Sequence, residues 1–90
     1  MRPLRRDELR ILKVLYRARC FGKGHLLEDN LLRHFPSNMV GDARDAVETL
    51  KREGIVVVHK TAHGVSVFID ASLRLEVYAA LLGIFPWLPR

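Results

Sequence analysis

The sequence predicts a single α+β domain made of three helices, a two-stranded β-hairpin and a C-terminal helix. Two patterns in the middle of the chain support this prediction. Apolar residues recur at spacings of three and four over residues 37–53, which is typical of one face of a helix. The β-branched run Ile55–Val58 and the alternating run Val65–Ile69 follow. Both favour strands, because branched side chains disfavour helix and fit a pleated surface.

Length and charge limit the function classes. Ninety residues are enough for one domain, spanning residues 1–90, and the net charge is +5. The first 23 residues hold eight basic and two acidic side chains, whereas the other 67 hold seven basic and eight acidic ones. The positive field therefore belongs to the N-terminal segment, which favours a negatively charged partner such as nucleic acid.

The composition favours a cytoplasmic protein. No apolar run reaches the roughly 20 residues that a membrane-spanning helix needs, and the segment Met1–Arg6 lacks the apolar core of a signal peptide. The single cysteine, Cys20, excludes an internal disulfide and fits a reducing compartment. The chain has no glutamine and only two asparagines, a scarcity that is typical of thermophile proteins.

The first helix is predicted from Leu4 to Arg19, with the glycine-containing segment Phe21–Gly24 breaking it. One broad face is apolar and consists of Leu9, Ile11, Leu12, Leu15 and Tyr16. Four cations, spaced four, three and four residues apart, fall together on another face: Arg6, Arg10, Lys13 and Arg17. This face is either a solvated surface or a set of phosphate contacts, and repulsion between the neighbouring charges favours a bound anion.

A second helix is predicted from about His25 to His34, and Pro36 ends it. Ser37 is then expected to cap the third helix by accepting a hydrogen bond from an exposed backbone N–H. Gly54 is expected to end that helix in a left-handed conformation. A helix, a very short turn and a second helix have the spacing of a helix-turn-helix. The link over residues 60–64 is short enough for a hairpin.

Residues 71–90 are predicted to form a final helix and an apolar tail, with Asp70 or Ser72 as the cap. Apolar residues cover nearly the whole circumference of this helix, and so short a chain has little left to bury it. We therefore expect an interface with a second copy or with a partner protein. Its expected residues are Leu75, Tyr78, Leu82, Phe85 and Trp87. A tail folded back on its own core is the alternative, and the alternation over residues 73–77 leaves a short strand possible.

No motif predicts an enzyme, a cofactor or a metal site. Cys20 lacks the neighbouring residues that activate a nucleophile. His59 and His63 can approach each other across the hairpin turn, but the chain lacks paired ligands at metal-binding spacing on one predicted helix. Asp42 and Asp45 share a helix face, which is more typical of solvated carboxylates than of an acid/base pair.

The order helix, helix, helix, hairpin, helix resembles the winged helix-turn-helix superfamily over residues 4–82. The run Leu50–Val56 looks especially like the junction between the third helix and the wing in small archaeal and bacterial regulators. The resemblance implies that the helix over 38–53 enters the major groove and that the hairpin tip over 61–64 touches the DNA. The contacts that it implies are Asn38, Arg44, Thr49 and Arg52 on the helix, and Lys60 and His63 on the wing.

The third helix departs from the family's expected charge, because its outward positions include acidic Asp42, Asp45 and Glu48. We therefore expect DNA binding to depend on phosphate contacts from the first helix. The leading hypothesis is a dimeric, cytoplasmic winged-helix protein that binds double-stranded DNA as a transcriptional regulator or architectural factor. The alternative is a winged-helix interaction module in a larger assembly, without direct nucleic-acid binding. RNA binding through the basic helix is a third hypothesis, but it needs exposed aromatic platforms, and the chain offers few.

Overall fold

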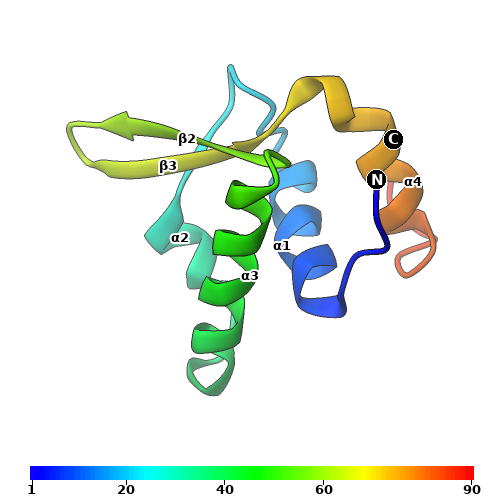
Figure 1. Ribbon diagram of the computed structural model, residues 1–90, viewed down its shortest axis with the longest axis horizontal. Helices are drawn as coiled ribbons and strands as arrows, with labels where there is room; N and C mark the ends of the chain where they lie inside the picture. The colour runs from blue at the N-terminus through cyan, green and yellow to red at the C-terminus, as the bar shows by residue number, and fades with distance from the viewer.

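The computed structural model describes residues 1–90 as a mixed α+β fold of four α-helices and a three-stranded antiparallel sheet (Figure 1). The predicted α+β class is thus confirmed. The helices are α1 (Arg6–Arg17), α2 (Glu28–Leu32), α3 (Val40–Arg52) and α4 (Arg74–Leu82). The strands are β1 (Leu26–Leu27), β2 (Val56–Thr61) and β3 (Gly64–Ile69). Short 3₁₀ turns, Ser37–Met39 and Ala71–Leu73, precede α3 and α4.

Helix α1 lies at the centre of the fold, between α3 and α4 in Figure 1, and it also contacts α2 and β3. Its predicted apolar face is buried along its whole length, with no residue of that face more than 6% exposed. The Tyr16 ring stacks on Tyr78 of α4 at 5.5 Å and meets Phe21 edge-on at 5.4 Å. The helix is shorter than predicted at both ends, and Arg19 follows it with a φ of 59°.

A buried carboxylate ties the N-terminal arm to two helices. Glu8 is 2% exposed, and it accepts hydrogen bonds from the Arg5 backbone N–H at 2.7 Å and from Arg2 Nη1 at 3.0 Å. Arg2 Nε also donates to both carboxylate oxygens of Glu53, just beyond the end of α3, at 2.7 Å. The hydrogen bonds from Arg2 lower the pKa of both carboxyl groups. Residues 1–5 therefore bridge the start of α1 and the end of α3.

The prediction of a helix over residues 25–34 is wrong for its first turn. Leu26 and Leu27 instead form β1, which pairs antiparallel with β3, placing Leu26 opposite Val67 and Leu27 opposite Ser66. The free edge of β3 explains the difference, because its unpaired backbone groups gain hydrogen bonds when a neighbouring segment is extended. The sheet therefore has three strands in the order β1-β3-β2, where the sequence predicted two.

The start of the third helix also differs from the prediction, whereas its end is confirmed. Ser37 makes no capping hydrogen bond; it begins a 3₁₀ turn in which the Met39 N–H donates to the Pro36 carbonyl at 2.8 Å. Gly54 has a φ of 75°, the left-handed conformation expected after a helix end. The face of α3 that lies in the core consists of Ala43, Ala46, Val47 and Leu50.

The predicted hairpin is confirmed, with longer strands and a tighter turn. Pairing runs from Val56 opposite Ile69 to Thr61 opposite Gly64, so only two residues separate the strands. Thr61 Oγ1 donates to the Gly64 carbonyl at 2.9 Å and accepts from the His63 N–H at 3.2 Å. The hairpin extends beyond the helices at one end of the molecule (Figure 1).

The C-terminal segment folds back onto the core. Asp70 caps the 3₁₀ turn by accepting a hydrogen bond from the Ser72 N–H at 3.0 Å, which confirms Asp70 as the cap. The strand considered for residues 73–77 does not form, because these residues complete the 3₁₀ turn and begin α4. Val77 and Leu81 of α4 are fully buried.

The tail after α4 is anchored by one side chain. Leu88 is only 3% exposed, and its carbonyl accepts a hydrogen bond from the Tyr78 hydroxyl at 3.3 Å. The fold-back that the sequence left as an alternative is therefore present for this part of the tail. None of the four α-helices combines the length and apolar character needed to cross a membrane.

We predict that Glu8 makes stability depend on acid pH. Because Arg2 lowers the pKa of folded Glu8, the ionised carboxylate stabilises the fold above its ordinary pKa of 4.5, and this contribution is lost as the pH falls below 4.5. Glu8→Gln should therefore reduce the free energy of unfolding by about 1–3 kcal/mol at neutral pH. Its stability should also fall less steeply with acid than that of the wild type.

Urea unfolding, followed by circular dichroism at a series of pH values from neutral to acid, measures both effects. Asp29→Asn is the matched control, because Asp29 is exposed and forms no ion pair. Some dependence should persist in Glu8→Gln, since Glu53 shares Arg2. A Glu8→Gln variant with the full wild-type pH dependence would contradict the prediction.

Candidate nucleic-acid interface

The four cations predicted to share a face of α1 lie on its solvent side, away from its buried face. Arg6 and Arg17 are exposed, and Arg10 and Lys13 are half-buried. None of the four forms an ion pair with a carboxylate. We call this set (Arg6, Arg10, Lys13 and Arg17) the cationic face of α1. Its charge is not neutralised within the molecule.

Two other cations are paired within the molecule. Lys51 Nζ forms ion pairs with Glu28 of α2 and Glu48 of α3, and Arg2 is held by Glu8 and Glu53. A paired cation must give up its carboxylate before it can bind a phosphate, so such residues serve the fold. The four cations of the cationic face of α1 have no carboxylate to give up, so they are available to an anion.

Two cations of this face lie against aromatic rings of the tail, an arrangement that the sequence did not predict. Lys13 Nζ is 4.6 Å from the centre of the Phe85 ring, and Arg17 Cζ is 5.1 Å from that of the Trp87 ring. A cation is attracted to the negative face of an aromatic ring, and this contact leaves its charge intact. No spacing rule connects residues more than 60 positions apart, so the contact had no signal in the sequence.

A groove lies along the cationic face, between α1 and the segment that carries β1 and α2. One part has a volume of about 490 Å³ and is lined by Lys13, Val14, Arg17, Ala18, Leu26 and His34. The adjoining part, about 340 Å³, shares three of these residues and is lined by Arg10, Lys13, Val14, His34, Phe35, Pro36 and Phe85. No residue lining either part is acidic, so the potential in the groove is positive.

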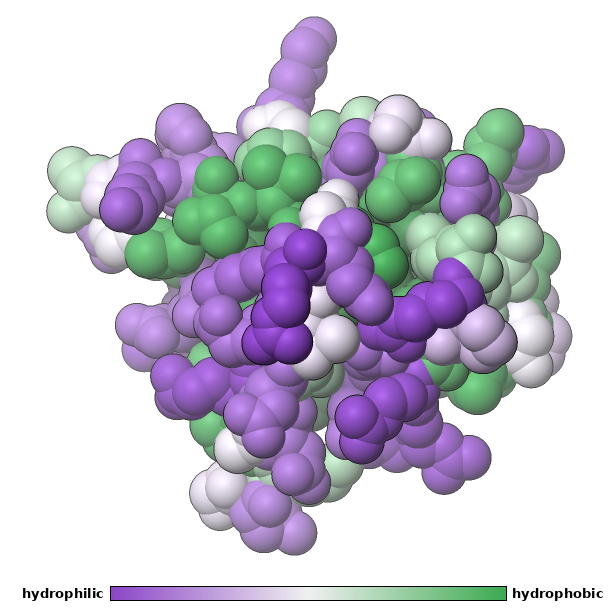
Figure 2. Space-filling view, in the orientation of Figure 1, coloured by the Kyte–Doolittle hydropathy of each residue, from purple (hydrophilic) through white to green (hydrophobic).

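The outward face of α3 carries mixed charges. Arg44 and Arg52 are exposed, as expected for a nucleic-acid contact, but the neighbouring Asp42, Asp45 and Glu48 are exposed as well. Seen from the side of α3, the molecule is largely hydrophilic over this helix, with apolar side chains gathered over the hairpin (Figure 2). The charge of this face therefore does not favour a phosphate backbone.

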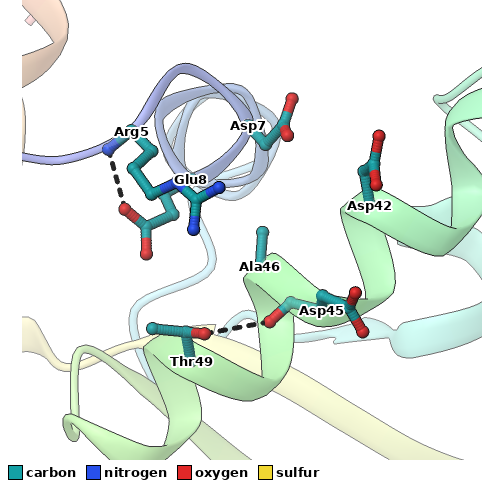
Figure 3. A pocket seen from close by; sticks show the side chains of 7 residues that line it. All are labelled: Arg5, Asp7, Glu8, Asp42, Asp45, Ala46 and Thr49. Carbon is teal, nitrogen blue, oxygen red and sulfur yellow. Dashed lines mark hydrogen bonds between the residues drawn. The ribbon is translucent and has the colours of Figure 1, made fainter.

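A cleft between α1 and α3 adds to the negative charge on this side (Figure 3). Its volume is about 110 Å³, and it is lined by Arg5, Asp7, Glu8, Asp42, Asp45, Ala46 and Thr49. Asp7 places a carboxylate of α1 next to those of α3. The hydroxyl of Thr49, a residue expected to contact DNA, donates to the Asp45 carbonyl at 3.1 Å within α3.

The remaining predicted contacts lie at the ends of elements. Asn38 is exposed in the 3₁₀ turn before α3, not on the helix itself. Lys60 and His63 are exposed at the far end of the hairpin. His59, considered as a partner of His63, lies instead beside His25, with ring centres 5.4 Å apart. No group of three or more metal-ligating side chains is present.

The five residues expected at a partner interface are placed in two ways. Leu75 and Trp87 are 64% and 57% exposed, whereas Tyr78, Leu82 and Phe85 are half-buried against the core. The exposed apolar surface of the C-terminal segment is thus smaller than its sequence suggests. It still includes Leu75 on the outer side of α4.

The surface divides by charge into two regions. Four unpaired cations and a groove without acidic residues lie on the solvent side of α1. Carboxylates border the cleft between α1 and α3. An anion the size of a nucleic-acid backbone would be attracted to the first region and repelled by the second. The chain matches no protein-family model, no curated protein and no solved structure.

Proposed function

We propose that this protein binds double-stranded DNA through the cationic face of α1. The observation that carries the proposal is that four cations share one solvent-facing side of a helix without any intramolecular carboxylate partner. From Arg6 to Arg17 the face spans about 16 Å at 1.5 Å per residue. This length corresponds to roughly five phosphates of one strand at 3.4 Å spacing.

The proposal includes a winged-helix arrangement. A short connection joins α2 to α3, and the β2–β3 hairpin follows α3 directly, which supports it. In this arrangement the residues of α3 and the hairpin are secondary contacts, because the carboxylates around α3 oppose phosphate binding. Those secondary contacts are Asn38, Arg44, Thr49, Arg52, Lys60 and His63.

We also propose that the protein acts as a dimer, as a transcriptional regulator or an architectural factor. The supporting observation is exposed apolar surface on the C-terminal segment, where Leu75 is 64% and Ile84 is 44% exposed. A two-fold dimer would present the cationic face twice and double the number of phosphate contacts. Binding to a duplex would then tighten without any change in the individual contacts.

An interaction module without nucleic acid is the second candidate function. The acidic cleft with Asp7, Asp42 and Asp45 favours it, because this surface is complementary to a basic protein. If the protein is a module, a partner captured from the source cells should remain bound after nuclease treatment. Loss of every partner on nuclease treatment would count against this candidate.

Neutralising residues of the cationic face should weaken DNA binding and its salt dependence together. Four phosphate contacts predict a slope of about −3.6 for log K against log salt concentration, because each contact contributes about 0.9. Arg10→Gln should reduce the magnitude of the slope by about 0.9, and Arg6→Gln/Arg10→Gln by about 1.8. Fluorescence anisotropy of a labelled short duplex at several salt concentrations measures both values.

The matched control for Arg10→Gln is Lys23→Gln. Lys23 is exposed in the loop between α1 and β1, and its removal changes the net charge by the same amount. The control should keep the wild-type slope. The proposal fails if the Arg10 and Lys23 variants change the slope equally, or if the wild type does not bind duplex DNA at low salt.

The dimer has a separate test. Leu75→Lys places a charge at the large exposed apolar side chain of α4, so it should convert a dimer to a monomer with little effect on the fold. Multi-angle light scattering at micromolar concentrations measures the mass of each form. Ala62→Lys, at an exposed position in the hairpin turn and away from α4, is the control for adding a charge. A wild-type protein that is monomeric over this range would rule out the dimer.

A further inference from the structure

We infer that the C-terminal half of the cationic face binds unpaired bases, so that it accepts a single-stranded stretch of nucleic acid. The inference rests on the proposed function, since the same cations would hold the phosphates. It adds a preference for unpaired bases, which phosphate contacts alone do not provide. Three observations carry it: two cation–ring pairs, the exposure of Trp87, and the absence of acids from the groove.

The cation–ring pairs run in parallel. Lys13 and Arg17 are one helical turn apart on α1, and each lies over one ring of the tail, Phe85 and Trp87 respectively. The two rings are 6.0 Å apart and inclined at 67°. Charge and aromatic surface thus alternate along this end of the cationic face. Proteins that bind single strands combine these same two elements, a positive groove and aromatic platforms.

Trp87 is positioned as a platform because its neighbour anchors it. The following residue, Leu88, is buried, and its carbonyl accepts the hydrogen bond from Tyr78, so the tail is fixed directly beside the indole. Despite its contacts with Arg17 and Phe85, Trp87 remains 57% exposed. A large, rigid aromatic surface held in place among cations loses little conformational entropy when a base stacks on it.

The two halves of the cationic face therefore differ in what they select. No aromatic ring lies over Arg6 or Arg10, so these two residues offer charge for a phosphate without a stacking surface. Lys13 and Arg17 adjoin rings, and the groove beside them contains no carboxylate that would repel a backbone. A base inside a duplex is stacked on its neighbours and cannot use Trp87, so the platform favours only strands with unpaired bases.

The experiment uses Trp87 as its own reporter, because it is the only tryptophan in the chain. Oligothymidylate should quench the Trp87 fluorescence of the wild-type protein on binding, while a blunt duplex should bind with little change in fluorescence. Oligouridylate, which carries ribose, tests whether the site distinguishes RNA from DNA. Equal quenching by the two oligonucleotides means that the site accepts unpaired bases on either backbone, and quenching by one alone means that it selects that backbone.

Variants separate stacking from anchoring of the tail. Stacking of one base is worth about 1–3 kcal/mol, so Trp87→Leu should weaken oligothymidylate binding by roughly 5- to 150-fold. Affinity for a duplex should fall much less, because Trp87 acts on duplex binding only through its contact with Arg17. Trp87→Phe, which keeps an aromatic face, should recover most of the loss. Leu88→Ala loosens the tail without removing the ring. It should weaken oligothymidylate binding less than Trp87→Leu does.

The outcomes distinguish this inference from the proposed function. Salt-dependent binding of duplex and single strand without quenching would overturn the inference and leave duplex binding in place. If Trp87→Leu lowers the affinity for duplex and single strand equally, the ring serves to anchor the tail, and the inference is overturned as well. If neither probe binds at low salt, the proposed function fails, and the inference fails with it.

Discussion

The burial of one side of α1 by four other elements is the constraint on which the rest of this structure depends. Helices α2, α3 and α4 and strand β3 all contact α1, and residues such as Ile11, Leu12 and Leu15 are completely buried between them. A helix held in this way has one side left for solvent, and its rotation about its own axis is fixed. The positions of the cations on the surface follow from the packing of the core.

The separation of charge follows from how the carboxylates are used. Glu8 and Glu53 are held by Arg2, and Glu28 and Glu48 by Lys51; all but the Lys51–Glu48 pair, which lies within α3, connect one segment to another. The four cations of the cationic face form no ion pair with any carboxylate. A surface that is positive on one side and negative on another orients an approaching polyanion before contact. This separation of charge would therefore orient a polyanion as well as attract it.

Periodicity predicted the elements that depend on local sequence, and it failed where distant segments meet. The apolar face of α1, the end of α3 at Gly54 and the cap at Asp70 were all readable from spacing and residue type. Strand β1 was not, because Leu26–Leu27 has a helix-like apolar pattern and becomes extended only by pairing with β3. The sequence placed the cations on one face of α1 but could not show that this face lacks ion pairs.

The aromatic part of the site lies beyond sequence reasoning for the same reason. Trp87 and Phe85 read as tail residues of an interface, and only the fold-back anchored by Leu88 brings them to α1. This arrangement has a consequence for binding at Lys13 and Arg17. A long cationic side chain loses rotamer freedom when it grips a phosphate, which opposes binding.

A carboxylate partner would order such a side chain but neutralise it, whereas an aromatic ring orders it and leaves the charge available. Lys13 and Arg17 are therefore both preorganised and unneutralised, while Arg6, with neither a ring nor a carboxylate beside it, must be ordered by the ligand itself. Contacts of equal charge along one helix should then differ in strength. We expect the end of α1 nearest the tail to be the stronger anion site, and it is also the end that carries the aromatic surface.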